Sequence, residues 1–272
     1  MSRSSKIPQI VIVGGGAGGL ELVTRLGESL GNKRLAKVTL IDQYSRHLWK
    51  PMLHEMASGT LDAADEGVSY IYHAMQHGYE FVQGVLTDIN REDHKLLIDP
   101  VTHDKSEKGA NTVDYDYLVL AIGSKTNDFG TEGAKQNSLF LENGDDAERI
   151  HEQLLNAVDP GGEASKEPYQ IVVIGGGATG VQVAAELRYA ALELARLHHV
   201  HRDVKVTIVE AGQKILAPFH PKVSRAASKR LAKWGVTVHV ADPVLSIEKE
   251  GVNLKSGNRL NSDMTIWAAG VK

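Results

Sequence analysis

Glycines near the start of the chain have the spacing of a phosphate-binding turn. Gly14, Gly16 and Gly19 follow the β-branched apolar run at residues 10–13 and precede a stretch that favours a helix. In such a turn the first glycine permits the sharp bend, the second lets the backbone approach a diphosphate, and the third lets the helix pack closely on the strand. A helix beginning near Ala17 would direct its unpaired N–H groups at the phosphates. The spacing therefore predicts a dinucleotide site.

An acidic residue at the end of the next apolar run supports this prediction. Asp42 ends a predicted strand at residues 37–42 and follows Gly19 by 23 residues. That separation is close to the ~20 residues expected for the acid that binds the adenosine ribose. A glycine turn that served packing alone would need no such acid. The residues expected to seat the first dinucleotide are Gly14, Gly15, Gly16, Ala17, Gly18, Gly19 and Asp42.

The same pattern returns at an offset of 161 residues, counted from Gly14 to Gly175. Its acid is Glu210, which follows Gly180 by 30 residues rather than 23. The intervening helix must therefore be about two turns longer than in the first copy. The residues expected to seat the second dinucleotide are Gly175, Gly177, Ala178, Thr179, Gly180 and Glu210.

Two such motifs in one chain predict an α/β protein with two Rossmann-like domains of the two-dinucleotide flavoprotein type. In such proteins one dinucleotide stays bound and stores an electron pair, and the other binds and leaves as a substrate does. FAD and a nicotinamide coenzyme are therefore the natural pair. Glu210 favours NADH, because a carboxylate binds ribose hydroxyls and repels a 2′-phosphate. Lys214 is the nearest cation that could favour NADPH. Hydride transfer between two stacked rings needs orientation rather than an acid or base.

Composition narrows the function further. The net charge of −4 is spread without blocks, which argues against a nucleic-acid partner, and the basic clusters resemble solvated helix faces. No apolar run approaches the ~18 residues of a transmembrane helix, and the first residues lack the apolar core of a signal peptide. We therefore expect a cytoplasmic chain. The chain has no cysteine, which excludes electron transfer through a thiol pair beside the flavin.

The pattern of apolar and polar residues in the rest of the chain predicts the other helices and strands. After a long loop at 43–59 we expect a helix at 64–77, a strand at 79–83, a hairpin at 86–98, a polar loop at 102–111 and a buried strand at 115–123. A helix at 145–158 and a flexible join at 160–168 follow, then a helix within 184–197, a helix at 221–234, a strand at 236–240, a hairpin at 243–254 and a strand at 264–270. The predicted domains are residues 1–124 for FAD, 125–168 as a connection, and 169–272 for NADH.

Small residues end the two late strands, where backbone can pass close to a cofactor. Ala121 and Gly123 are expected beside the flavin diphosphate, and Ala269 and Gly270 beside the nicotinamide half. Simple tight packing is the alternative for Gly123.

Histidines do not form a convincing metal site. His73 and His77 are spaced to share a helix face, but no third ligand is evident, so no metal is predicted. A second group, His198, His199 and His201, lies at a predicted helix end, where cations favour the helix dipole.

The run HLWKPMLHEMASG at residues 47–59, together with VIVGGGAGGLE and VVIGGGATGV, resembles the type II NADH:quinone oxidoreductases, the single-subunit respiratory NADH dehydrogenases. The resemblance extends from about residue 8 to the last residue. It implies that the first domain binds FAD, the second binds NADH, and electrons pass to a membrane quinone without proton pumping. Members of that family continue with a return to the FAD domain and a segment that docks on the cytoplasmic face of the inner membrane. We therefore expect a truncated chain with weak FAD binding and little activity, and a possible homodimer.

The resemblance also implies roles for single residues. Val85 would lie along the adenine, and Lys50 would stabilise negative charge on reduced flavin, unless it is only a solvated loop lysine. Gln182 stands where the resembled enzymes usually carry glutamate, and an amide cannot exchange a proton. The alternatives are a soluble FAD-dependent NADH reductase for a ferredoxin-like protein and a non-catalytic module that senses NADH.

Overall fold

The computed structural model describes residues 6–61, 67–101, 111–158, 167–198 and 202–270. The chain divides into two compact units, which are Met1–Trp49 with Glu66–Gly123, and Lys50–Asp65 with Ser124–Lys272. Most of the polar loop expected at 102–111, most of the join at 160–168, and His199 and His201 lie outside the described residues.

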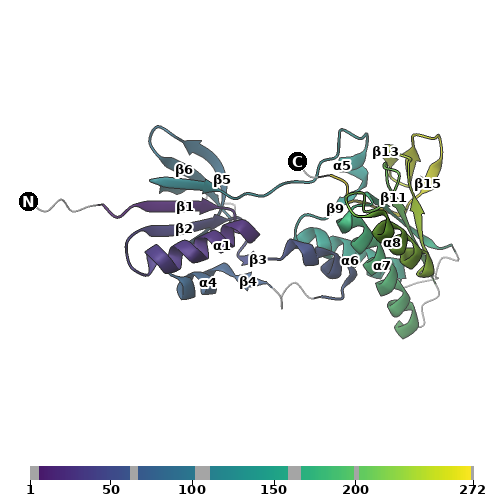
Figure 1. Cartoon of the computed structure of the whole chain (residues 1–272), viewed down its shortest axis with the longest axis horizontal. Helices are drawn as coiled ribbons and strands as arrows, with labels where there is room; N and C mark the ends of the chain where they lie inside the picture. The colour runs from purple at the N-terminus through teal and green to yellow at the C-terminus, as the bar shows by residue number, and fades with distance from the viewer. Residues whose placement is uncertain (1–5, 62–66, 102–110, 159–166, 199–201, 271–272) are drawn as a thin grey trace, which may run out of the picture. The chain divides into compact units, whose positions relative to one another are not determined.

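The first unit is built on a six-stranded sheet in the order β7-β6-β5-β2-β1-β8. Strands β8, β1, β2 and the first half of β5 run parallel, and β5, β6 and β7 form an antiparallel meander. The strands are β1 (Gln9–Val13), β2 (Lys37–Asp42), β5 (Glu80–Asn90), β6 (Lys95–Pro100), β7 (Asn111–Asp114) and β8 (Tyr117–Leu120). The short strands β3 (Arg46–His47) and β4 (Val68–Ser69) pair separately. The helices are α1 (Ala17–Leu26), which continues as a π-helix (Gly27–Gly31), and α4 (Tyr70–His77), and they lie against each other and the sheet (Figure 1).

Successive side chains of β1 point to opposite faces of this sheet, and apolar residues fill both faces. Ile12 packs with Val23 of α1, whereas Val11 and Val13 pack with Leu96 of the meander. All are buried, as expected of a parallel strand that is covered on both sides.

The second unit has a parallel sheet in the order β12-β11-β10-β16-β9 and a three-stranded antiparallel sheet in the order β13-β14-β15. Its strands are β9 (Leu139–Phe140), β10 (Tyr169–Ile174), β11 (Val204–Val209), β12 (Val236–His239), β13 (Val244–Glu248), β14 (Gly251–Leu254), β15 (Arg259–Asn261) and β16 (Met264–Trp267). Its helices are a 3₁₀ turn (Lys50–Met52), α2 (Leu53–Ser58), α5 (Ala134–Asn137), α6 (Gly144–Val158), α7 (Ala178–His198) and α8 (Pro221–Lys233). The longer helix predicted in the second copy is confirmed, because α7 has 21 residues, whereas α1 has 10 and its π-helical continuation 5.

Three sequence predictions need correction in the first unit. The helix expected from residue 64 begins at Tyr70, because Val68 and Ser69 are extended and pair with Arg46 and His47. The strands expected at 79–83 and 86–89 are one continuous strand, β5, with a bulge between Leu86 and Asp88. The strand expected to be buried at 115–123 is only β8, which lies at the sheet edge, and Tyr117 and Leu120 are 64% and 51% exposed.

The long loop expected at 43–59 contains regular structure. Helix α2 buries Leu53, Met56 and Ala57 and packs against α6 and α7 of the second unit. Residues 50–61 therefore belong by contact to the second unit, whereas the predicted domain boundary placed them with the first.

Candidate functional site

The glycines of the first turn have three different surroundings. Gly14 has a φ of +102°, and a Cβ there would lie 2.4 Å from the Ala121 carbonyl oxygen. A Cβ on Gly19 would lie 1.8 Å from the Gly14 carbonyl oxygen, so the helix contacts the turn directly. A Cβ on Gly16 would meet no atom within 4 Å. Two glycines thus serve the turn and its packing, and the open side at Gly16 fits the approach of a diphosphate.

The side-chain carboxylate of Asp42 binds to the backbone of this turn. Its Oδ2 accepts a hydrogen bond from the Gly15 N–H at 2.6 Å, and its Oδ1 accepts one from Tyr44 at 2.8 Å. The residue before α1, Gly16, gives no side-chain cap, so the first N–H groups of the helix are available to an anion. The donor set and the fixed carboxylate together fit a dinucleotide.

The second turn repeats this arrangement. Gly175 has a φ of +111°, a Cβ on Gly180 would lie 1.9 Å from the Gly175 carbonyl oxygen, and a Cβ on Gly177 would meet nothing within 4 Å. In both turns the middle glycine of the triplet, Gly15 or Gly176, is buried. The next one, Gly16 or Gly177, is exposed, as are the two residues after it, Ala17 with Gly18 and Ala178 with Thr179. The chain therefore presents the same arrangement twice. We call residues 14–19 with Asp42 the first cradle, and residues 175–180 with Glu210 the second cradle.

Glu210 holds the second turn as Asp42 holds the first. Its Oε2 accepts a hydrogen bond from the Gly176 N–H at 2.7 Å, and its Oε1 accepts one from the Gly212 N–H at 2.6 Å. The nearby Lys214 donates to the Phe219 carbonyl at 2.9 Å. The carboxylate is thus fixed at the edge of the cradle, while the amino group is bound elsewhere.

The ends of β8 and β16 lie beside the first glycine of each turn. Ala121 donates to the Val13 carbonyl at 2.7 Å, and Ala268 donates to the Ile174 carbonyl at 2.8 Å. Two residues later, Gly123 and Gly270 have φ values of +71° and +70°. The two strand ends therefore share the same backbone conformation, and their roles beside the cofactors stay predictions.

Residues 127–129 lie against the end of β16. The indole of Trp267 donates from Nε1 to the carbonyls of Asn127 at 3.0 Å and Ala269 at 2.9 Å. A Cβ on Gly270 would lie 2.5 Å from the ring of Phe129. These contacts hold the loop after β16 against residues 127–129 within the second unit.

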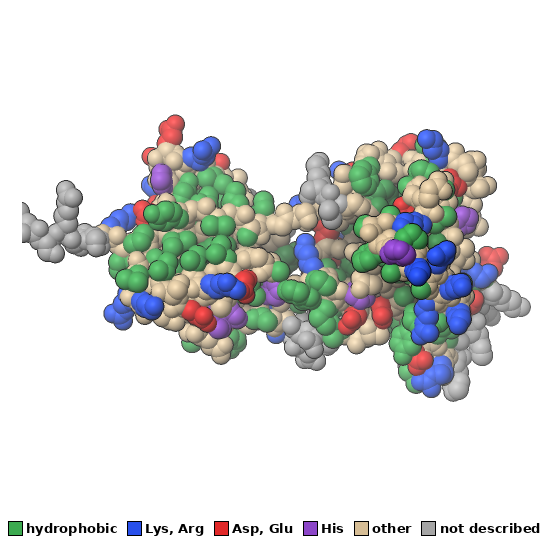
Figure 2. Space-filling view, viewed as in Figure 1, with side chains coloured by type: hydrophobic (Ala, Val, Ile, Leu, Met, Phe, Trp, Pro, Cys, Tyr) green, Lys and Arg blue, Asp and Glu red, His purple; other side chains and the backbone are tan. Residues whose placement is uncertain are grey.

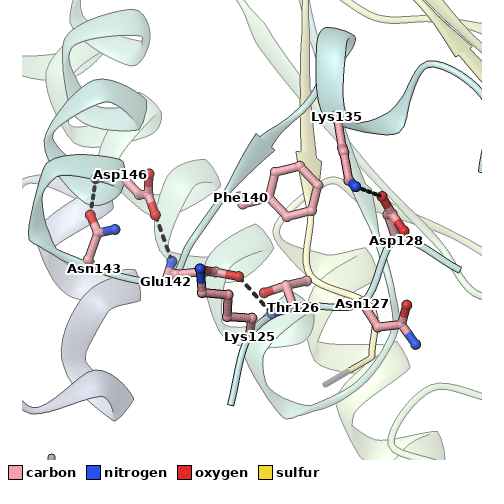
Figure 3. A pocket seen from close by; sticks show the side chains of 9 residues that line it. All are labelled: Lys125, Thr126, Asn127, Asp128, Lys135, Phe140, Glu142, Asn143 and Asp146. Carbon is pink, nitrogen blue, oxygen red and sulfur yellow. Dashed lines mark hydrogen bonds and ion pairs between the residues drawn. The ribbon is translucent and has the colours of Figure 1, made fainter. Parts of the chain in front are cut away.

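A pocket of about 450 Å³ opens in the second unit, and none of its lining residues belongs to either glycine turn. Its polar groups bind one another, as Figure 3 shows: Glu142 accepts from the Thr126 N–H at 2.6 Å, and Lys135 pairs with Asp128 at 3.3 Å. The lining residues are Lys125, Thr126, Asn127, Asp128, Lys135, Phe140, Glu142, Asn143 and Asp146. These bonds fix the segment after Gly123 on the start of α6.

The three residues singled out by resemblance are exposed. Val85 lies on β5 and is 40% exposed. Lys50 begins the 3₁₀ turn of the second unit, and Gln182 lies on an exposed position of α7. Their roles toward a cofactor remain predictions.

His73 and His77 stack at a ring distance of 4.1 Å, and each has a protein partner. His73 Nδ1 lies 3.0 Å from the Tyr79 hydroxyl, and His77 Nδ1 lies 2.7 Å from Glu28 Oε1. Among the described residues no group of three or more potential ligands has the geometry to hold a metal ion. The pair therefore acts in packing.

We expect this packing to weaken in acid. Burial, followed by the nearby charge of His77, lowers the pKa of His73 below its ordinary value. The unfolded chain then binds a proton more readily than the folded one, so this stabilisation is complete above about pH 6.5 and is lost as the pH falls toward the folded pKa. Urea unfolding between pH 5 and 8 should show this slope in the wild type and a flatter one in His73→Phe. Equal slopes would contradict the assignment to His73.

Basic side chains gather over α8 (Figure 2). The helix carries no acidic residue, and its cations are Lys222, Arg225, Lys229, Arg230 and Lys233, all exposed. This agrees with the solvated helix face expected from the sequence. No described helix is long and apolar enough to cross a membrane.

Sequence reasoning missed the side chains that hold the starts of the β1–β8 and β10–β16 pairs and the first turn. Asp116 and Asp263 accept from the N–H groups of Gln9 and Gln170, both at 2.7 Å, at the start of each parallel strand pair. Each acid stands five residues before its small residue, Ala121 or Ala268, so comparing the two copies would have found them. His47 and Tyr70 also contact the first turn, and no pattern shared by the two copies points to these residues.

Residues 8–272 match the model of the pyridine nucleotide-disulphide oxidoreductase family. The chain belongs to this family. The predicted fold class is therefore confirmed.

The predicted resemblance is also confirmed. The chain is 38% identical to the type II NADH:quinone oxidoreductase of Haemophilus influenzae, over 97% of this chain and 64% of that protein. It is 30% identical to that of Staphylococcus aureus, over 97% and 65%. The chain thus spans less than two thirds of the length of these relatives. NDH2 from Plasmodium falciparum in complex with NADH superposes with a TM-score of 0.83 at 24% identity, covering 98% of this chain and 55% of that one, which shows the shared fold.

Proposed function

We propose that this member of the family acts in an FAD-dependent NADH dehydrogenase that passes electrons to a membrane quinone. The observation that carries the proposal is the twin cradle, in which each turn combines an open glycine, a helix N-terminus and an anchored acid. The resemblance to the type II NADH:quinone oxidoreductases assigns FAD to the first cradle and NADH to the second, and the 38% identity with the Haemophilus influenzae enzyme of that name supports this resemblance. Bound FAD would accept hydride from NADH and release electrons singly or in pairs.

The residues of the chain supply binding and orientation. The N–H groups at Gly16 and the start of α1 would hold one diphosphate, and those at Gly177 and the start of α7 would hold the other. Asp42 and Glu210 would accept hydrogen bonds from ribose hydroxyls. Ala269, whose carbonyl accepts a hydrogen bond from Trp267, and Gly270 would line the nicotinamide half. In this proposal Lys50 stabilises negative charge on reduced flavin, and Val85 lies along the adenine.

The choice of electron acceptor is tested directly. The FAD-loaded protein is mixed with NADH and either a soluble quinone or an oxidised ferredoxin, and the absorbance of NADH is followed. Oxidation of NADH with the quinone alone supports the proposal. Oxidation with ferredoxin alone would instead indicate a ferredoxin reductase. NADH binding without oxidation by either acceptor would indicate a sensing module.

Gln182 provides a prediction on quinone reduction. If a proton-exchanging group at this exposed position of α7 assists quinone protonation, Gln182→Glu should raise the quinone reductase rate severalfold and give it a new dependence on pH. Rates should be measured in FAD-loaded wild type and variant from pH 5 to 8. Superimposable profiles would refute a role in the rate.

A further inference from the structure

The carbonyl of Gly15, inside the first glycine turn, is held by two side chains from other segments. The Tyr70 hydroxyl donates to it at 2.6 Å, and His47 Nδ1 lies 2.8 Å from it. Tyr70 is 2% exposed and His47 is 8% exposed. Since a carbonyl oxygen can only accept, His47 must carry its proton on Nδ1. The contact is thus a buried double hydrogen bond to one backbone oxygen.

This contact sets the direction of the next N–H group. The chain has no cis peptide bond among its described residues, and in a planar trans peptide the N–H points opposite to the C=O. Drawing the Gly15 carbonyl toward the buried Tyr70 and His47 therefore turns the Gly16 N–H away from them. Gly15 is buried and Gly16 is exposed, so this peptide crosses from the core to the open side of the turn.

The second turn fixes the equivalent peptide by a different means. The Gly176 carbonyl accepts a hydrogen bond from the backbone N–H of Leu216 at 2.7 Å. Leu216 has a φ of +53°, so a specific loop conformation presents this donor. The two cradles share an oriented peptide, but only the first depends on side chains for it.

The surroundings of Tyr70 keep its hydroxyl a donor. Burial raises the pKa of Tyr70, and the negative charge of Asp42 raises it further, so the proton is retained. The centroid of the Tyr70 ring lies 5.1 Å from that of Phe81. The His47 ring makes an edge contact with the Tyr70 ring at a centroid distance of 6.4 Å. Both donors are therefore held in place before any ligand arrives.

We propose that Tyr70 and His47 are positioning residues that preset the Gly15–Gly16 peptide, so that the Gly16 N–H faces the diphosphate of FAD. This inference rests on the proposed assignment of FAD to the first cradle. The two side chains do not touch the ligand themselves. Their contribution is to preorganise a donor that would otherwise rotate on binding.

The test compares two tyrosine variants of the same chain by titration with FAD, following the quenching of flavin fluorescence. Tyr70→Phe keeps the ring and removes one donor to the Gly15 carbonyl, so FAD affinity should fall about fivefold to tenfold. Tyr79→Phe is the matched control, because its buried hydroxyl contacts His73 rather than the turn. The affinity for NADH should be the same in all three proteins.

Histidine variants give a second measurement. His47→Gln retains an N–H donor and should bind FAD more tightly than His47→Leu, which has none. Unchanged FAD affinity in Tyr70→Phe, or an equal loss in Tyr79→Phe or in NADH binding, would overturn the inference while leaving the FAD assignment intact. Failure of the wild type to bind FAD would overturn both.

Discussion

Replacing Gly19 with alanine is expected to destabilise the first unit by about 3 kcal/mol and to weaken FAD binding more than tenfold. The added Cβ would lie 1.8 Å from the Gly14 carbonyl oxygen, and backbone cannot yield as a flexible side chain does. Relief requires α1 to move away from the turn, which displaces its N-terminal N–H groups from the diphosphate. The change thus damages packing and binding together.

Hydrogen exchange measures this effect unit by unit. Amides of β1 should exchange faster in Gly19→Ala, while amides of β10 in the second unit should keep their wild-type protection. The matched control is Gly18→Ala, also within α1, whose Cβ meets no atom within 4 Å and should leave the stability equal or slightly higher. Protection of β1 equal to wild type in Gly19→Ala would contradict the packing argument.

Gly16→Ala separates binding from stability at the same turn. Gly16 has a φ of −60° and a ψ of −178°, which alanine adopts without strain, and its Cβ would occupy open space. The free chain should therefore be as stable as wild type within about 0.5 kcal/mol. FAD affinity should still fall, because the methyl group fills the place where the diphosphate would approach. Unchanged FAD affinity in this variant would contradict the proposed seat.

The two turns and their acids were predictable because their information is local. Glycine spacing, a preceding β-branched strand and an acid at the end of the next strand all lie within a short stretch of sequence. The structure brings Asp42 to Gly15 and Glu210 to Gly176, so each acid lies at the turn whose ribose it is predicted to bind. The repeated pattern also allowed each copy to support the interpretation of the other.

The missed features depend on contacts between distant segments. Tyr70 reaches Gly15 across 55 residues, and no periodic pattern marks a tyrosine for that contact. The donor at Leu216 is a backbone group presented by an unusual φ, which side-chain types do not reveal.

The contacts of residues 50–61 with the second unit were missed for a related reason. The buried side chains of α2 need an apolar surface, and only the folded structure shows that α6 and α7 provide it.

Glu210→Gln is expected to reduce the preference for NADH over NADPH by tenfold or more. The carboxylate is fixed by two backbone N–H groups, at 2.7 Å and 2.6 Å, so it cannot swing away from an incoming 2′-phosphate. Two like charges about 4 Å apart near a protein surface repel by up to ~4 kcal/mol, part of which solvent screens. Glutamine removes this repulsion and retains an oxygen that accepts from one of the two backbone donors.

The control for this prediction carries the same change of charge away from the turn. Glu250→Gln alters an exposed acid between β13 and β14, so it should shift the affinities for NADH and NADPH equally and slightly. Calorimetric titration of both coenzymes into the wild type and both variants gives the ratio directly. An unchanged ratio in Glu210→Gln would mean that the adenosine ribose lies elsewhere, and the second cradle would then need a different acid. A shift in Glu210→Gln alone ties coenzyme choice to the carboxylate that also holds the second glycine turn.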